Sequence, residues 1–441
     1  MAISRGLDTP MTRLDRAIIL DESGDSDALR ALESVAAETK HPDIAVRLAR
    51  ALYAHARKHD AKNMLDLAVR TWPDNVDLYV ERARLQHWDG DPDEGASAIE
   101  AAVRARPYDM RLRLACADVL RRSGAAERAL EVLREGLRFS PESAELLTSV
   151  GVVLDDEDRI GEALEALRAA AKAQPESFVA RQNLASVLLR AGAPDEAHAI
   201  LNALRLARPL DQSTIGYEAL ALRMLGDPRY GELYDYTRLV RAYDIQAPAG
   251  FASADEFNQA LAERLRALHI STRHPLNQSL RGGTQTDRSL PLSDPLIGAF
   301  FDFARQSVEA YAGNLDEASS HPVDARKAPA HRVAGSWSVR LAAGGFHINH
   351  VHPAGWLSSA YYVEVPPDVA DEAAQAGWLK FGEPASATPG CTPDFAVQPK
   401  VGRLVLFPSY MWHGTVPFAA GAERLTIAFD VVPSPLTSPG R

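Results

Sequence analysis

Small and apolar residues recur with a fixed period along the first half of the chain. Prolines stand 34 residues apart, and small residues keep two fixed places between them. The prolines are Pro73, Pro107, Pro141, Pro175 and Pro209; the small residues are Ala49, Ala83, Ala117, Gly151 and Ala185 at the first place, and Ala61, Gly95, Ala129, Ala163 and Ala197 at the second. A period of this length, with small residues where paired helices must approach closely, predicts an all-α solenoid of helical hairpins.

The period ends close to Asp244. A sixth unit keeps Ala219 and Gly231, but Tyr243 stands where the next proline would be. We therefore expect a degenerate terminal unit that docks on the following domain instead of receiving another repeat. An apolar helical pattern around residues 28–37 predicts a cap at the other end. The predicted domains are a helical cap over 1–41, repeats over 42–243 and a C-terminal domain over 244–441.

The C-terminal domain has a different pattern. Apolar residues at helical spacing predict helices over 253–268 and over about 295–311. From Gly335 onward the runs become short and alternating, rich in β-branched and aromatic residues and separated by Pro and Gly. This alternation predicts an antiparallel, barrel-like β domain with the helices packed outside it.

Three histidines in the β region have the spacing of a metal site. His350 and His352 are two residues apart, so on an extended segment both side chains would point to the same side. His413 follows a later apolar run, predicted to be a strand over 403–407. Three ligands on one side of an iron ion leave open positions for a bidentate cosubstrate and for oxygen.

An Arg-x-Thr sequence follows the third histidine. On a strand, Arg424 and Thr426 would share one face while Leu425, Ile427 and Phe429 face the core. A guanidinium fork with a neighbouring hydroxyl is suited to holding a carboxylate. The order of the motifs therefore favours a non-haem iron site with a carboxylate-bearing cosubstrate.

The net charge and the composition of the chain limit which partners it is expected to bind and where in the cell it is expected to be. The formal net charge is -11, which disfavours a broad surface for nucleic acid or for an anionic membrane. Two distant cysteines give neither a disulfide framework nor a thiolate metal site. There is no signal-peptide pattern and no apolar run of membrane-spanning length. We expect a cytoplasmic protein that binds neither nucleic acid nor membrane.

The repeats resemble the tetratricopeptide repeat over roughly residues 42–243. The fourth unit carries much of its pattern, in Leu147, Val150, Gly151 and Leu154, and then in Ala163, Leu167, Ala170 and Pro175. The resemblance implies a groove that binds a protein or peptide partner. The alternative is an array that serves only for dimerisation or spacing.

The C-terminal segment resembles the Fe(II)/2-oxoglutarate-dependent oxygenases, over roughly residues 273–432. The resemblance rests on H-x-H-P and L-S-x-x-Y-Y from His350, F-P-S and His413, and E-R-x-x-I-x-F from Glu423; H-P-L-N-Q-S-L-R-G-G-T-Q-T, residues 274–286, belongs to it as well. It implies a double-stranded β-helix (jelly roll), with Fe(II) bound by His350, His352 and His413. Arg424 and Thr426 would hold the distal carboxylate of 2-oxoglutarate. Tyr362 is the candidate for a further bond to the cosubstrate, with Tyr361 as the alternative.

One position departs from the wider superfamily, which has Asp or Glu where this chain has His352. Three imidazoles leave more positive charge on iron than two imidazoles and a carboxylate do. Either His352 is a ligand nonetheless, or a carboxylate such as Glu364 or Asp430 takes its place. His347 is a further candidate, behind a ligand or on the substrate side.

The expected function is that of a 2-oxoglutarate-dependent dioxygenase, an enzyme that uses O2 to hydroxylate a protein or peptide presented by the repeat groove. Two alternatives stay open. One is a three-histidine dioxygenase that needs no 2-oxoglutarate. The other is a tetratricopeptide scaffold without catalytic activity.

Overall fold

The computed structural model describes residues 10–22, 27–271, 278–286, 289–316, 319–419 and 423–434. The chain forms two compact units, each described here by itself. One unit comprises Met1–Phe139, Ala267–Gln278 and Thr284–Gly298, and the other comprises Ser140–Arg266, Ser279–Gly283 and Ala299–Arg441. Residues 274–277 of the predicted H-P-L-N motif, together with Arg273, lie outside the described residues.

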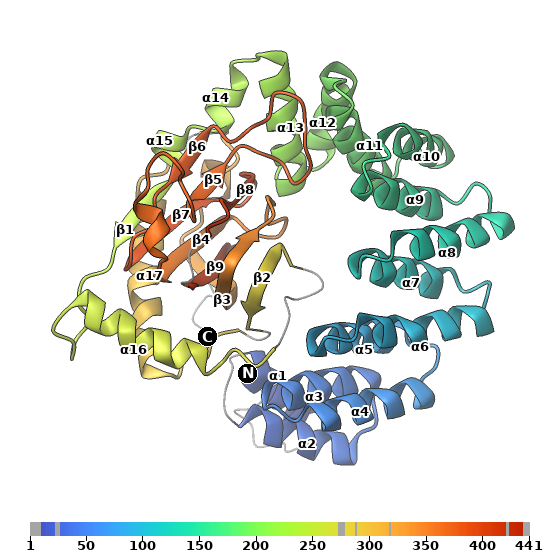
Figure 1. Cartoon of the computed structure of the whole chain (residues 1–441), viewed down its shortest axis with the longest axis horizontal. Helices are drawn as coiled ribbons and strands as arrows, with labels where there is room; N and C mark the ends of the chain where they lie inside the picture. The colour runs from blue at the N-terminus through green and yellow to red at the C-terminus, as the bar shows by residue number, and fades with distance from the viewer. Residues whose placement is uncertain are drawn as a thin grey trace, which may run out of the picture. The chain divides into compact units, whose positions relative to one another are not determined.

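The first unit is built of antiparallel helix pairs (Figure 1). Its helices are α1 (Pro10–Glu22), α2 (Ala28–Glu38), α3 (Pro42–Ala54), α4 (Lys58–Thr71), α5 (Val76–Asp89), α6 (Pro92–Ala105), α7 (Met110–Arg122) and α8 (Ala126–Phe139). Helix α2 corresponds to the apolar pattern predicted over 28–37, whereas α1 was not predicted. The solenoid pattern continues in the second unit.

The second unit begins with the remaining repeats. Its helices are α9 (Ala144–Asp156), α10 (Ile160–Ala173), α11 (Phe178–Arg190), α12 (Pro194–Ala207), α13 (Gln212–Leu225), α14 (Arg229–Leu233) and α15 (Tyr236–Leu239). Helix α14 has only five residues, where the earlier repeats have a second helix of fourteen residues. The terminal repeat is therefore degenerate, as the loss of the pattern at Tyr243 predicts.

The periodic residues form the turns and the close contacts of the repeats. Each periodic proline follows the second helix of a pair, where it cannot continue the helix. The small residues lie where helices meet. A Cβ added at Gly95 would lie 3.0 Å from the carbonyl oxygen of Ala83, and one added at Gly151 would lie 2.5 Å from the Leu167 side chain. Larger residues at these places would push the helices apart.

The C-terminal part of the second unit contains two antiparallel sheets. The larger one has the strand order β1-β7-β4-β9-β3-β2, and the smaller one has the order β6-β5-β8. The strands are β1 (Arg241–Asp244), β2 (Leu280–Gln285), β3 (Ala330–His347), β4 (Leu357–Glu364), β5 (Leu379–Phe381), β6 (Phe395–Val397), β7 (Arg403–Pro408), β8 (His413–Thr415) and β9 (Arg424–Ser434). The prediction of a helical solenoid followed by an antiparallel β domain is confirmed.

Two helices accompany the larger sheet, α16 (Ala254–Arg266) and α17 (Pro295–Gly313) (Figure 1). Phe300 of α17 lies with its ring centroid 4.6 Å from that of Tyr361 on β4. The Tyr361 hydroxyl donates a 2.8 Å hydrogen bond to Asn258 of α16. These contacts cover the face of the sheet that carries Leu425, Ile427 and Phe429, so the opposite face is left for the candidate site.

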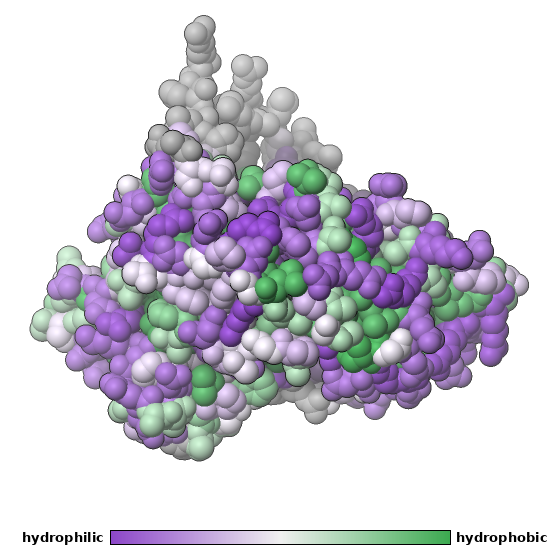
Figure 2. All heavy atoms as spheres, turned by 90° about the horizontal axis from the view of Figure 1, so that it is seen from above, coloured by the Kyte–Doolittle hydropathy of each residue, from purple (hydrophilic) through white to green (hydrophobic). Residues whose placement is uncertain are grey.

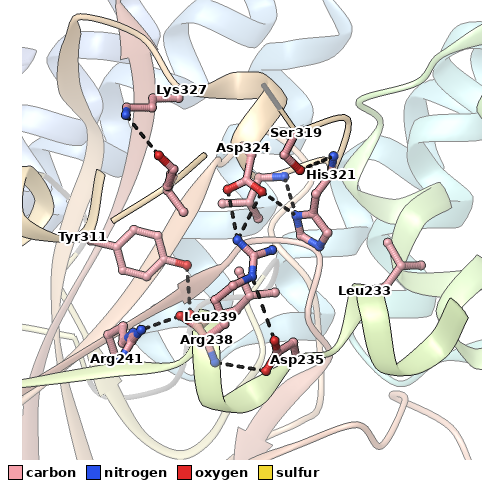
Figure 3. Close-up of polar contacts among 12 residues, drawn as sticks. Leu233, Asp235, Arg238, Leu239, Arg241, Tyr311, Ser319, His321, Asp324 and Lys327 are labelled. Atoms are coloured by element: carbon pink, nitrogen blue, oxygen red, sulfur yellow. Dashed lines mark hydrogen bonds and ion pairs between the residues drawn. The ribbon is translucent and has the colours of Figure 1, made fainter. Parts of the chain in front are cut away.

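The end of the repeats is bonded to the β domain (Figure 3). Arg238 of α15 pairs with the buried carboxylate of Asp324, 3.1 Å away. The Tyr311 hydroxyl of α17 donates to the Leu239 carbonyl at 2.9 Å. Strand β1 follows directly and pairs with β7, across the boundary predicted between residues 243 and 244. The division into domains at residues 41 and 243 stays a prediction.

The surface is mixed in character. On the face drawn in Figure 2, hydrophobic residues occur in groups between polar residues. Exposed large hydrophobic side chains of the repeats include Val179 and Leu206, which is ordinary for a protein surface. Within the described ranges, no helix is both long enough and apolar enough to cross a membrane.

Candidate metal centre

The two close histidines lie on an extended segment between β3 and β4, not within a strand. Backbone hydrogen bonds attach this segment to the chain around β8: the His350 amide donates to the His413 carbonyl at 2.9 Å, and the His413 amide donates back at 3.1 Å. The His352 amide donates to the Ser409 carbonyl at 2.8 Å. These bonds fix the backbone positions from which the three histidine side chains extend.

The three imidazoles converge as their spacing predicts. Their ring centroids are 4.9 Å apart for His350 and His352, 4.3 Å for His350 and His413, and 5.2 Å for His352 and His413. One nitrogen of each ring lies within 4.8 Å of the others. Three nitrogens at such separations can contact one ion at the distances of about 2.0–2.1 Å typical of metal-bound imidazole.

Each ring has an acceptor at its Nδ1 atom. His350 Nδ1 lies 2.8 Å from the Ile348 carbonyl, and His413 Nδ1 lies 2.9 Å from the Met411 carbonyl. His352 Nδ1 lies 2.7 Å from a carboxylate oxygen of Asp430. These acceptors assign the proton to Nδ1 in each neutral ring and leave the lone pair on Nε2, which is the usual arrangement behind a metal-bound histidine.

The assigned tautomers produce a conflict that a cation would resolve. The Nε2 atoms of His350 and His352 are 3.0 Å apart. With both protons on Nδ1, two lone pairs face each other at this distance and repel. The arrangement therefore calls for a proton or a metal ion between the rings.

Burial favours the neutral form of His350 and His413. Desolvation, and next the charge of His352, lower the pKa of His350 to about 3. Desolvation is also the first cause, and His350 the second, of a pKa of His413 well below its usual value. Neutral imidazoles keep their lone pairs available for a metal at physiological pH.

Arg424 is a buried cation near the three histidines. Its side chain is 3% exposed, and it has no carboxylate partner among the described residues. One guanidinium nitrogen donates to Thr415 Oγ1 at 2.9 Å, while the Nε atom is buried with no acceptor in the part of the chain that the structure describes. Burial lowers the pKa of Arg424. A buried guanidinium with unused donor capacity is suited to an anionic ligand.

Thr426 and Tyr362 accompany Arg424 on one face of the sheet. Tyr362 on β4 is directly opposite Thr426 on β9, and Thr426 is also opposite Val339 on β3. The guanidinium carbon of Arg424 lies 5.0 Å from the centre of the Tyr362 ring, and among the described residues the buried Tyr362 hydroxyl has no hydrogen-bond partner of good geometry. Tyr361 faces the opposite side, toward α17, so of the two tyrosines only Tyr362 lies on the face that carries Arg424.

The two alternative carboxylates lie elsewhere. Glu364 forms an ion pair with Arg266 of α16. Asp430 contacts the Nδ1 atom of His352, not the side of the ring that faces the other histidines, and it also accepts a 2.8 Å bond from Ser358. In this geometry the Nε2 side of His352 faces the other two histidines, and the Asp430 carboxylate holds the ring from its Nδ1 side.

Three residues near the histidines were not singled out from the sequence. Trp337 stacks on His352 with ring centroids 6.0 Å apart. Ser279 lies 3.3 Å from His350 Nε2 and 2.9 Å from His347 Nδ1, so Ser279 connects His347 to the side of the His350 ring that faces His352. Thr415 binds Arg424. Ser279 lies within the 274–286 motif and Thr415 lies two residues after His413, so the sequence placed both beside named residues without showing their contacts, whereas Trp337 belongs to none of the motifs.

Comparisons with known families agree with this architecture. Residues 335–430 match a family described as "Putative 2OG-Fe(II) oxygenase". Residues 89–144 and 156–215 each match a family described as "Tetratricopeptide repeat". A search of curated proteins found no match.

Solved structures similar to the chain include both kinds of protein. A Pseudomonas putida prolyl-4-hydroxylase aligns over 46% of this chain and 97% of its own, at 16% identity and a TM-score of 0.31. A thermophilic tetratricopeptide-repeat protein of Thermus thermophilus aligns over 41% of this chain and 99% of its own, at 24% identity and a TM-score of 0.32. Yeast Tom70 aligns over 54% of this chain and 52% of its own, at 15% identity and a TM-score of 0.42.

The family matches define the class of protein. The chain carries tetratricopeptide repeats followed by a domain of the 2OG-Fe(II) oxygenase family, so both predicted resemblances are confirmed. Family membership of the C-terminal domain implies Fe(II) and 2-oxoglutarate, and the three histidines are a possible iron site. Tetratricopeptide repeats generally mediate protein–protein interaction.

Proposed function

We propose that this chain is a 2-oxoglutarate-dependent dioxygenase that hydroxylates a protein or peptide. The observation that carries the proposal is the orientation of three imidazoles whose Nδ1 atoms are all bonded away from the centre. Membership of the C-terminal domain in the oxygenase family supports it. The cytoplasm is the proposed compartment.

The residues fit the cofactors that the family implies. His350, His352 and His413 would bind Fe(II) through the nitrogens that face one another. Arg424 would pair with the distal carboxylate of 2-oxoglutarate, with Thr426 and the unsatisfied hydroxyl of Tyr362 as further partners. The unsatisfied donors of Arg424 and Tyr362 are the features that an anionic cosubstrate would explain.

When bound, iron and 2-oxoglutarate supply an oxidant: O2 and 2-oxoglutarate give succinate and CO2, and one oxygen atom enters a C–H bond of the substrate. The residues of the chain would orient the histidine rings and shield the carboxylate of 2-oxoglutarate from water. Asp430 orients His352, and the Ile348 and Met411 carbonyls orient the other two rings. Burial of Arg424 excludes water from the carboxylate pair and so strengthens it.

A polypeptide is the proposed substrate because the repeats and the β domain are bonded to each other within one compact unit. The hydroxyl of Tyr410, three residues before His413, donates to the Leu233 carbonyl of α14 at 2.7 Å. The end of the repeat array is thus fixed close to the histidines. A partner bound along α9 to α13 would lie on the same body as the candidate metal centre.

The test is an anaerobic titration of Fe(II) into the purified chain, with and without 2-oxoglutarate, followed by the weak visible band of the iron–keto-acid chelate. We expect a band only when both are present, and its loss in His413→Ala. Iron binding without the band would favour the three-histidine dioxygenase that needs no 2-oxoglutarate. Absence of iron binding would remove the proposed activity and leave the tetratricopeptide scaffold.

A further inference from the structure

Ser279 and His347 form a hydrogen-bonded pair beside the candidate metal centre. The Ser279 hydroxyl oxygen lies 2.9 Å from His347 Nδ1 and 3.3 Å from His350 Nε2, the nitrogen proposed to bind iron. Both residues of the pair belong to the compact unit that holds the three histidines. The proposed function gives neither of them a role.

The backbone fixes the position of Ser279. The amide of Ile348 donates to the Ser279 carbonyl at 2.9 Å. Ser279 directly precedes β2, which lies beside β3 in the larger sheet, and His347 is the last residue of β3. A Cβ added at Gly345 would clash with the Gly282 carbonyl oxygen, so the two strands are in close backbone contact here. The hydroxyl therefore reaches His350 from a segment that is attached to the sheet.

The part of the site that contains this pair is accessible. His413 is 6% exposed, whereas Ser279 and His347 are partly exposed, as are His350 and His352. The oxygen of Ser279 also lies about as near to His350 Nε2 as His352 Nε2 does, at 3.3 Å against 3.0 Å. Ser279 thus occupies the place of a neighbour to a bound ligand, on the side that a small molecule can reach.

The two contacts of Ser279 define where its proton lies. His350 Nδ1 donates to the Ile348 carbonyl, so the lone pair of the neutral ring is on Nε2. The Ser279 contact with this nitrogen is a hydrogen bond only if the hydroxyl donates to it. A hydroxyl has one proton, so His347 must then donate from its Nδ1 atom to the Ser279 oxygen.

Metal binding would redirect this proton. Once the lone pair of His350 Nε2 is bound to a metal, the Ser279 hydroxyl can no longer donate to it. The His347 Nδ1–H still occupies a lone pair of the Ser279 oxygen. The hydroxyl proton therefore turns toward the space next to His350 Nε2, where a facial set of three ligands leaves a coordination position open.

We propose that Ser279 donates a hydrogen bond to an anionic ligand in the open coordination position next to His350, and that His347 is the positioning residue that holds the hydroxyl. The inference rests on the proposed function, because it assigns a further binding group to the same site. The ligand is a negatively charged donor atom: the keto-acid end of 2-oxoglutarate, or a small anion in the position left for O2. Hydrogen bonds to charged acceptors are stronger than those to neutral ones.

The test uses the full chain loaded with Co(II), whose visible absorption reports changes in its ligands without turnover. The probes are 2-oxoglutarate, and azide in the presence and absence of 2-oxoglutarate. Ser279→Ala removes the hydroxyl, and Ser279→Thr keeps it. His347→Leu removes the ring nitrogens, and His347→Asn keeps a polar atom near the place of Nδ1. Ser307→Ala is the matched control, the same change at a buried serine of α17 that donates to the Phe303 carbonyl.

We expect Ser279→Ala to weaken binding of at least one of the two anions about tenfold, and Ser279→Thr to stay within about threefold of the parent. His347→Leu should weaken the same anion about threefold, and His347→Asn should restore part of the loss, because a bonded donor strengthens the next hydrogen bond. A loss confined to 2-oxoglutarate would place Ser279 at the keto-acid end, and a loss confined to azide would place it at the position left for O2. Affinity for Co(II) should not change, and Ser307→Ala should behave as the parent.

Unchanged affinity for both anions in Ser279→Ala would overturn the proposal. A parallel loss of Co(II) affinity would also overturn it, because a residue that only supports His350 would produce that result. If 2-oxoglutarate does not bind to the parent but Ser279→Ala weakens azide binding, the role of Ser279 stands and the proposed activity fails.

Discussion

Replacing Arg424 by methionine separates a role in cosubstrate binding from a role in stability. Methionine keeps most of the length and apolar contact of the side chain but removes the charge. Breaking a buried ion pair by removing one partner costs about 3–5 kcal/mol. At about 3 kcal/mol, 2-oxoglutarate should bind about a hundredfold more weakly, since each 1.4 kcal/mol is about tenfold.

The stability of the protein without ligands should respond differently. The guanidinium is buried, has no carboxylate partner among the described residues, and makes one hydrogen bond, to Thr415. Loss of a neutral-acceptor bond costs about 1 kcal/mol, and removal of an uncompensated buried charge offsets it. We expect the free energy of unfolding of Arg424→Met to stay within about 1 kcal/mol of that of the parent.

Two assays provide the comparison. Calorimetric titration of 2-oxoglutarate into the Mn(II)-loaded chain measures affinity without turnover, and urea unfolding of the metal-free chain measures stability. Arg340→Met is the matched control, because Arg340 is paired with Glu423 at 2.7 Å and lies on the other face of the sheet, opposite Leu425. Affinity for 2-oxoglutarate within threefold of the parent in Arg424→Met would refute the assignment. A large loss of stability with unchanged affinity would make Arg424 a structural residue.

Three further outcomes follow from the structure. Asp430→Asn should weaken metal binding about 10- to 100-fold in a Mn(II) or Zn(II) titration, because the carboxylate behind His352 raises the basicity of the ring; unchanged affinity would contradict that role. Burial lowers the pKa of His350 to about 3, from about 6.5 in the unfolded chain, so on acidification the unfolded chain binds a proton before the folded chain does. The free energy of unfolding of the metal-free chain should therefore fall below about pH 6.5, by about 2 kcal/mol at pH 5 from His350 alone. Urea midpoints that do not change with pH would count against this assignment. Gly283→Ala should destabilise the chain by about 1–3 kcal/mol in urea, since its Cβ would lie 2.2 Å from the Arg340 carbonyl oxygen, whereas Gly161→Ala, with open space around it, should not.

The repeats could be predicted from the sequence because their signal is local and recurs. A helix pair needs a small residue at each crossing and a turn after its second helix, and these requirements return every 34 residues. Helices α16 and α17 were predictable for a similar reason, since one apolar face fixes each of them. Helix α1 was missed because it lies before the periodic region and contains none of the residues that recur every 34 positions.

Only those residues of the candidate site that belong to short sequence motifs could be predicted. Arg424 and Thr426 share one face because they lie two apart on β9, and His350 and His352 point the same way because they lie two apart on an extended segment bonded to His413. Trp337 reaches His352 through the order of the strands, which no local pattern encodes, and the contact of Ser279 with His350 could not be predicted although Ser279 lies in the 274–286 motif. The glycine pair at 282 and 283 was too weak a pattern to interpret; in the structure, Gly283 allows β2 to approach the backbone of β3 closely.

If His350, His352 and His413 bind the metal as proposed, the position of Asp430 would explain how three histidines can replace two histidines and a carboxylate. In the wider superfamily that this chain resembles, the carboxylate stands where His352 stands here. In this chain the Asp430 carboxylate lies 2.7 Å from His352 Nδ1, so one negative charge remains but is moved behind the ring. The charge of the three rings and Asp430 together equals that of two rings and a carboxylate. His352→Asp would face one carboxylate with another and should weaken metal binding, whereas adding Asp430→Asn to it should recover binding, because the repulsion is then gone.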